Sequence, residues 1–179
     1  MPKKENQQNL TAEPESLNPI EYEKAPRAGF WRRIGAIVYD LLVVTAVIML
    51  ASGIALGFVG LLTATGLLSL QEGQDHASVL QGNWFYSLYL VAVVIWFYAG
   101  FWVRGGQTLG MRTWRLRVQN EDGSRISKRQ AIIRAFTALL GLGNLTVLFG
   151  QNRLALQDRL ARCEVIVLSK EANQFKNWK

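Results

Sequence analysis

Apolar residues fill two long blocks of the chain, residues 34–70 and 84–103, and no lysine or arginine lies between Arg33 and Arg104. A membrane-spanning helix needs about 20 predominantly apolar residues. The second block has this length. The first block is longer, which fits either a tilted helix or a helix followed by a segment at the far interface. We therefore expect two transmembrane helices, over about residues 34–59 and 84–103.

A third apolar stretch, residues 131–150, allows two structures. It contains Arg134 and a polar, glycine-rich interruption at residues 141–144. A single span would carry the C-terminal tail across the membrane, whereas a hairpin of two short helices that breaks at residues 141–144 would return it. Basic segments resist export, and residues 152–179 hold six lysines and arginines. This favours the hairpin slightly and leaves both structures open.

Two short stretches outside the apolar blocks have strand character. Residues 114–118 and 163–168 are rich in β-branched, aromatic and other apolar side chains, which are common in strands. They could pair if the tail lies on the same side of the membrane as residues 104–130. The sequence thus predicts an all-α integral membrane protein with two clear transmembrane helices, a third apolar segment and a small cytoplasmic two-stranded β element.

The distribution of basic residues predicts the topology. Lysines and arginines crowd residues 24–33 and 104–130, while the loop at residues 71–83 has none. Basic flanks stay in the cytoplasm, so the N-terminus should be cytoplasmic and the loop outside. Residues 1–25 are polar and should form a disordered cytoplasmic tail, without a cleavable signal peptide. A membrane domain at residues 26–168 and a C-terminal tail at residues 169–179 complete the expected organisation.

Composition narrows the function. The net charge of +7 could indicate nucleic acid, but the basic residues border apolar blocks, where the lipid bilayer and anionic lipids at the cytoplasmic face account for them. A single cysteine, Cys163, and a single histidine, His76, offer no metal site and no disulfide. With no nucleophile–base pair and no phosphate-binding loop, we expect no enzyme activity and no cofactor.

Asp40 interrupts the first apolar block, and a carboxylate inside a membrane is costly enough to need a partner or a function. Arg33 lies on the same helix face, but seven positions away, which is roughly 10 Å along the axis. We therefore expect a partner from another segment, with Arg134 first and Arg104 second. A structural charge and a proton or cation site both remain open. The short depth, about two turns, favours the structural charge.

The same residues carry a family resemblance. Arg33, Ala36 and Asp40, spaced by three and four positions, resemble the opening signature of the RDD family, small bacterial membrane proteins named for one arginine and two aspartates. Residues 105–110, 116–118, 122–123 and Arg134 resemble its central block, which makes Gln107 and Thr108 secondary candidates. Residues 156–160 resemble its C-terminal block and supply Asp158 as the second aspartate.

The resemblance spans about residues 26–168 and implies a bacterial inner-membrane protein, with transport, including cation/proton exchange, as the loosely suggested role. It implies a polar cluster of Arg33, Asp40, Arg134 and Asp158. The sequence departs from the family pattern in three places, which hold Met111, Gln157 and Cys163 where lysine, histidine and threonine are common. A proton path that needed the histidine would be missing here.

Two functions follow as hypotheses. The first is transport, or assistance to a transporter. The second is a non-catalytic membrane scaffold whose basic cytoplasmic module binds a partner. Two or three spans provide little material for a transport path, so a transporter of this size would need to form a homo-oligomer. Gly53 and Gly57 are four residues apart, a spacing that permits close helix packing, and we interpret it as packing within the protein.

Overall fold

The structure, a computed structural model, describes residues 25–150 and 152–174. The predicted N-terminal tail, apart from Ala25, and the last five residues lie outside the described residues. The described chain is mostly helical, with one small antiparallel sheet. The expected all-α membrane fold with a two-stranded β element is therefore confirmed.

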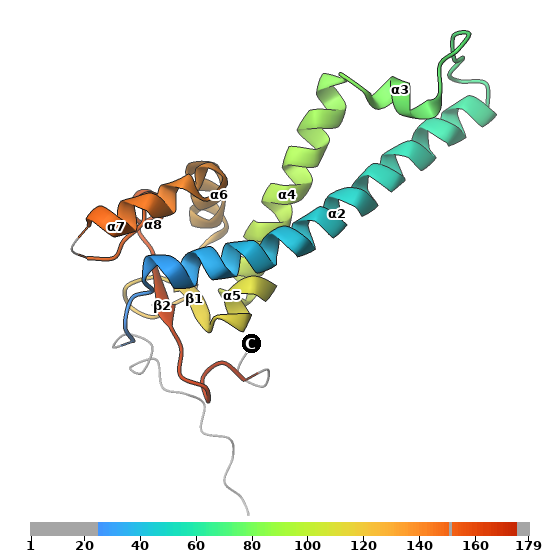
Figure 1. Cartoon of the computed structure of the whole chain (residues 1–179). Coiled ribbons are helices and arrows are strands. Elements are labelled where there is room, and N and C mark those ends of the chain that lie inside the picture. Colours follow the sequence, from blue (N-terminus) through green and yellow to red (C-terminus); the bar gives the residue numbers. More distant parts are fainter. Residues whose placement is uncertain (1–24, 151, 175–179) are drawn as a thin grey trace, which may run out of the picture.

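Two long helices form the apolar part of the fold (Figure 1): α2 (Phe30–Ala64) and α4 (Trp84–Gly105), connected through α3 (His76–Leu80). Both are long and apolar enough to cross a membrane. Helix α2 has 35 residues, which at 1.5 Å per residue is about 52 Å, against roughly 30 Å of bilayer hydrocarbon. The first apolar block therefore forms one long helix that extends to Ala64, beyond the expected end at residue 59.

Local sequence explains the ends of α4. The Asn83 side chain accepts hydrogen bonds from the N–H groups of Phe85 (2.9 Å) and Tyr86 (3.4 Å), which would otherwise be unpaired at the helix start. At the other end Gly106 adopts the left-handed conformation (φ 70°) that commonly stops a helix. Between these caps the helix has the length expected for a single span.

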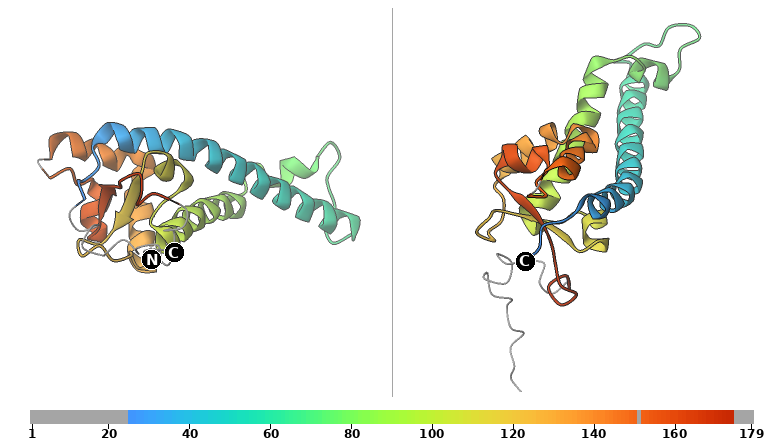
Figure 2. Two further views of the ribbon diagram at one scale, coloured as in Figure 1. Left: turned by 90° about the horizontal axis from the view of Figure 1, so that it is seen from below. Right: turned by 60° about the vertical axis from the view of Figure 1, so that its left-hand side comes forward.

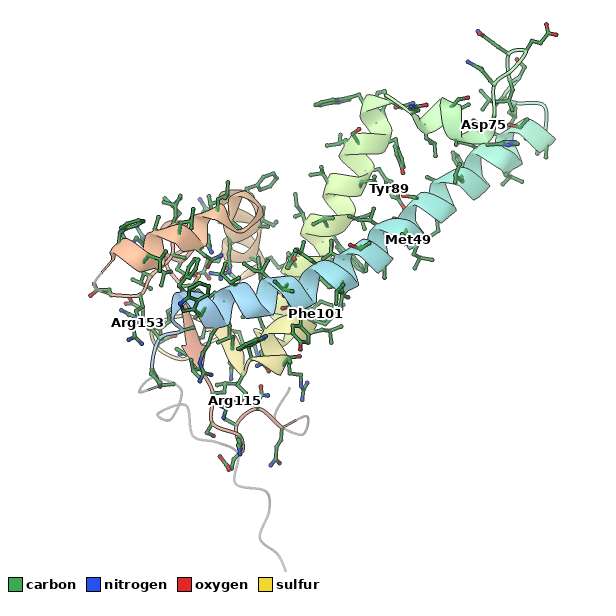
Figure 3. All side chains as sticks on the ribbon, in the orientation of Figure 1. Met49, Asp75, Tyr89, Phe101, Arg115 and Arg153 are labelled. Carbon is green, nitrogen blue, oxygen red and sulfur yellow. The ribbon has the colours of Figure 1, made fainter. Side chains whose placement is uncertain are left out.

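The two spans contact each other through polar groups near the middle of α2. The Tyr86 hydroxyl donates to Ser52 Oγ (2.8 Å) and the Tyr89 hydroxyl donates to the Ala51 carbonyl oxygen (3.3 Å); Figure 3 shows Tyr89 on the side of α4 that faces α2. Gly53 and Gly57 do not take part, because a Cβ atom added at either would meet no atom within 4 Å in the described protein. The prediction that these glycines pack within the protein is therefore wrong.

The remaining elements form a compact lobe at one end of the spans. They are α5 (Leu109–Thr113), β1 (Leu116–Gln119), α6 (Lys128–Thr137), η1 (Leu139–Leu145), α7 (Thr146–Phe149), α8 (Leu156–Ala161) and β2 (Glu164–Val167). Strands β1 and β2 pair antiparallel, with Leu116 opposite Val167 and Gln119 opposite Glu164. The main hydrophobic core lies here, around Leu116, Val118 and Ile126.

The third apolar segment is neither a straight span nor a tight hairpin. Helix α6 ends at Thr137, and the following helical stretch, residues 141–149, turns away from it by 86°. The bend lies at residues 138–140, where α6 is followed by the start of η1, and the predicted break at 141–144 lies farther along within η1. Because β2 pairs with β1, the chain after this segment returns to the end of the spans from which β1 emerges, as Figure 2 shows.

Candidate functional site

A fully buried carboxylate, that of Asp158, joins two buried arginines from different helices. Asp158 is in the first turn of α8 and has 0% exposure. Its Oδ2 accepts from Arg33 Nη2 at 2.7 Å and from the Ala155 N–H at 3.0 Å, while its Oδ1 pairs with Arg134 Nη1. Arg33, Arg134 and Asp158 are called the arginine–aspartate cluster below. It links the start of the first span to α6 and α8.

Arg33, in the first turn of α2, has partners for every nitrogen of its guanidinium group. Nε donates to the Ala28 carbonyl (3.1 Å), Nη1 to Asn144 Oδ1 (3.4 Å), and Nη2 also to the Arg153 carbonyl (3.2 Å). Figure 3 shows Arg153 beside the start of α2. These bonds fix the entrance of the first span to the lobe, since a buried guanidinium has little freedom to exchange such partners.

Arg134, in α6, packs against α4 as well as binding Asp158. Its guanidinium carbon lies 5.0 Å from the centre of the Trp102 ring, a cation–π contact. Its Nη1 also approaches the Cys163 sulfur at 3.4 Å. Its Nε has no hydrogen-bond partner among the described residues. Arg134 thus joins the end of the second span to the cluster and keeps one unused buried donor.

The cluster carries an excess of positive charge, because two guanidinium groups share one carboxylate. Burial alone would raise the pKa of Asp158, but the charges of Arg134 and Arg33 and their hydrogen bonds outweigh it and lower that pKa below its usual value. Asp158 therefore stays ionised at neutral pH. Burial raises the pKa of the Cys163 thiol, so this cysteine is a poor nucleophile at neutral pH.

Asp40 belongs to a separate site, and the predicted pairing with Arg134 or Arg104 is wrong. Among the described residues its carboxylate forms no ion pair. Its Oδ2 accepts from Thr108 Oγ1 at 2.5 Å and its Oδ1 from the Gly110 N–H at 2.8 Å. Both donors lie at the N-terminus of α5, where backbone N–H groups lack helical partners. Asp40 therefore acts as a cap supplied by another helix.

Close approach makes this cap possible. A Cβ atom on Gly110 would collide with the Ala36 carbonyl oxygen and would lie 2.8 Å from Asp40 Cγ. Thr108 Oγ1 meanwhile accepts from the Met111 N–H at 3.2 Å, so one hydroxyl connects the carboxylate to the next turn. A glycine at position 110 is therefore a structural requirement for joining α5 to α2.

The four predicted cluster residues thus divide into two groups. Arg33, Arg134 and Asp158 lie together, whereas Asp40 lies with the secondary candidate Thr108. Gln107, also buried, donates to the Leu116 carbonyl (2.7 Å) and to Asn173 Oδ1 (2.9 Å). Arg104 is exposed at the end of α4.

Sequence reasoning missed Asn144 and Gln157 as members of the polar network. The Gln157 side-chain amide donates to Asn144 Oδ1 at 3.0 Å, and that oxygen also accepts from Arg33. Asn144 had a usable signal, since an amide inside an apolar stretch needs a partner. Gln157 had no such signal beyond its departure from the family pattern. Its Oε1 has no partner among the described residues and faces Gly143.

A pocket of about 540 Å³ opens beside the cluster. Asp158 and Cys163 line it together with exposed arginines, Arg159 and Arg162, and with residues 120–122 of the loop after β1. No three histidine, cysteine or carboxylate side chains in the described part of the chain are grouped so that they could hold a metal ion. The site is therefore a salt-bridged junction between helices, with a solvent-facing depression on one side.

The fold and the cluster together define a small helical membrane protein with a polar junction at one end of its spans. The sequence model of the RDD family matches residues 27–162, which include both groups of polar residues. The chain belongs to the RDD family. Among curated proteins and among solved structures, no significant match is found.

Proposed function

We propose that this RDD protein is a non-catalytic membrane scaffold or transporter accessory, which presents its lobe to a partner at the cytoplasmic face of the bacterial inner membrane. One observation carries the proposal: the buried charged residues of both sites, Arg33, Arg134, Asp158 and Asp40, each have partners within the protein. Asp158 is shared by Arg33 and Arg134, and Asp40 is held by α5. Such bonds suit a fixed junction better than a path along which ions move.

The proposed orientation rests on charge. The segments next to the lobe ends of both spans contain Arg32, Arg33, Arg104 and Arg112, and the loop at the far end has no basic residue. Positive residues are retained in the cytoplasm, and anionic lipids attract them there. The lobe and both chain ends would then be cytoplasmic, with α3 outside.

A photo-crosslinking amino acid at Arg125 or Arg129, both exposed on the lobe, tests the scaffold in living cells. We expect one discrete adduct, identified by mass spectrometry as the same protein from both positions. The matched control places the crosslinker at Ser78 in α3, on the opposite end of the molecule. Adducts that are equally abundant at Ser78, or diffuse at all positions, would contradict a specific partner of the lobe.

Cation or proton transport is a second candidate, and the Asp40 geometry favours it. This carboxylate lies in the first span, is 3% exposed and has no cationic partner among the described residues. A buried carboxylate without a counter-ion is suited to taking up a proton or a cation. Flux would depend on the ionisable group, which an amide of the same shape lacks.

Reconstituted vesicles with an imposed Na⁺, K⁺ or pH gradient distinguish the two candidates. The scaffold predicts no flux above that of empty vesicles. Flux that is present in the wild type and lost in folded Asp40→Asn would establish transport instead. Arg104→Gln is the matched control, because it removes an exposed charge at the same end of the spans.

A further inference from the structure

The third apolar segment exposes large side chains although it is not built as a span. Residues 135–152 contain no charged residue. Within them Phe136, Leu142, Leu145, Leu148 and Phe149 are 63%, 65%, 46%, 54% and 88% exposed. So many exposed large apolar side chains on one short segment mark a surface that is normally covered.

Contacts with α2 limit how deep this segment can reach. A Cβ atom on Gly141 would lie 3.3 Å from Ile37 Cδ1, and Asn144 Oδ1 is bonded to Arg33. Ile37 lies seven positions after Phe30, the first residue of α2, which is about 10 Å along the axis. The glycine-rich turn therefore lies beside the first turns of a helix that continues for some 40 Å beyond it.

The two ends of the segment are held at the same position along the axes of the spans. Before the bend, Arg134 stacks on Trp102, three residues from the C-terminus of α4. After the bend, the Arg153 carbonyl accepts from Arg33. Figures 1 and 2 show α6 and α7 beside the spans, at their lobe end. Entry, bend and exit thus all adjoin the lobe ends of α2 and α4.

We propose that residues 136–149 dip into the leaflet next to the lobe and return without crossing, with their exposed apolar side chains among its acyl chains. Lipid is the occupant that the observations favour, because the apolar surface continues from two membrane-spanning helices. Basic residues also flank it, with Lys128 and Arg129 before and Arg153 after, as in interfacial segments that bind anionic lipid surfaces. The chain then crosses the membrane twice.

This proposal goes beyond the proposed function and does not depend on it, since a scaffold and a transporter could both contain such a segment.

The test is site-directed spin labelling in vesicles of phosphatidylcholine and phosphatidylglycerol. Single cysteines replace Leu145 and Phe149. Leu50, exposed in the middle of α2, gives the deep reference, and Ser124, exposed on the lobe, gives the aqueous reference. The unmodified protein reports background labelling of buried Cys163.

Collision rates with oxygen and with a water-soluble nickel chelate give the depth of each label. We expect labels at 145 and 149 to collide more with oxygen than with nickel, at a depth between those of the labels at 50 and 124. Labels as deep as position 50 would show a true span. Labels that collide with the nickel chelate as often as the label at position 124 would show an aqueous surface. Labels shielded from both reagents would show a protein partner, such as a second copy. Each of these three results would overturn the proposal.

Discussion

Replacing Asp158 with asparagine should be among the most damaging single changes in the lobe. The amide keeps the size of the carboxylate and one oxygen for the Ala155 N–H. It removes the anion shared by Arg33 and Arg134, which are 3% and 5% exposed. Removing one partner of a buried ion pair lowers the free energy of unfolding by about 3–5 kcal/mol. We expect a loss in this range, because two cations are left without a counter-ion.

The unequal numbers of charges predict an order among variants. Arg134→Gln leaves one arginine facing one carboxylate, a balanced pair, so it should cost less than Asp158→Asn. The double variant leaves Arg33 alone and should be more stable than the sum of the two losses predicts. This order follows from two guanidinium groups sharing one aspartate.

Unfolding in mixed micelles of increasing denaturing detergent, followed by tryptophan fluorescence and circular dichroism, measures these differences in the free energy of unfolding. Asp122→Asn is the matched control, because it makes the same chemical change at an exposed loop position. It should stay within about 0.5 kcal/mol of the wild type. The reasoning fails if Asp158→Asn behaves like this control, or if Arg134→Gln is the more damaging variant.

Three further predictions concern the same two sites. Gly110→Ala should destabilise by about 1–3 kcal/mol, because its Cβ meets Ala36 and Asp40, whereas Gly100→Ala, with nothing within 4 Å, should be neutral or stabilising in the same detergent titration; equal effects would contradict the close approach. Asp40→Asn keeps one oxygen that can accept from the Gly110 N–H, and its NH2 group can donate to Thr108 Oγ1, so it should cost less than about 1 kcal/mol. Asp40→Ala leaves both groups without this partner and should cost about 1–3 kcal/mol; equal losses would mean that the carboxylate charge itself stabilises the junction. The pKa of Asp158 is lowered on folding, so its contribution is present above its unfolded pKa of about 3.9 and is lost as the pH falls through the folded value. Wild-type stability should therefore drop more than that of Asp158→Asn in acid titrations below about pH 4, and parallel curves would contradict this.

The spans and the small sheet could be predicted because their signals are local. Long apolar blocks between basic flanks indicate helices across a membrane, and short stretches rich in β-branched and other apolar residues indicate strands. The 86° bend could be anticipated from the glycines at 141 and 143, but its position at residues 138–140 could not. That position depends on how Asn144 reaches Arg33, a contact between residues 111 positions apart.

The partner of Asp40 was mispredicted for a physical reason. An intramembrane carboxylate suggests a counter-charge, so the sequence indicates an arginine as its partner. The structure satisfies it with the hydroxyl of Thr108 and the N–H of Gly110, and a backbone donor leaves no mark in the sequence. The grouping of Arg33 with Asp158 was easier to expect, because the family signature names both and a returning tail brings them to one end.

The sheet has a consequence for biosynthesis. Strand β2 closes the lobe by pairing with β1, and Ile166 also forms a bridge with Arg27, just before the first span. A nascent chain exposes both partners long before β2 leaves the ribosome. Spans that insert during synthesis do so while β1 still has an open edge, and the lobe can only close after synthesis of residue 167. During that interval the open edge of β1 can bind chaperones or pair with a wrong strand. A stop codon upstream of Glu164 should yield molecules whose spans are inserted but whose lobe cannot close, and quality-control proteases should degrade them.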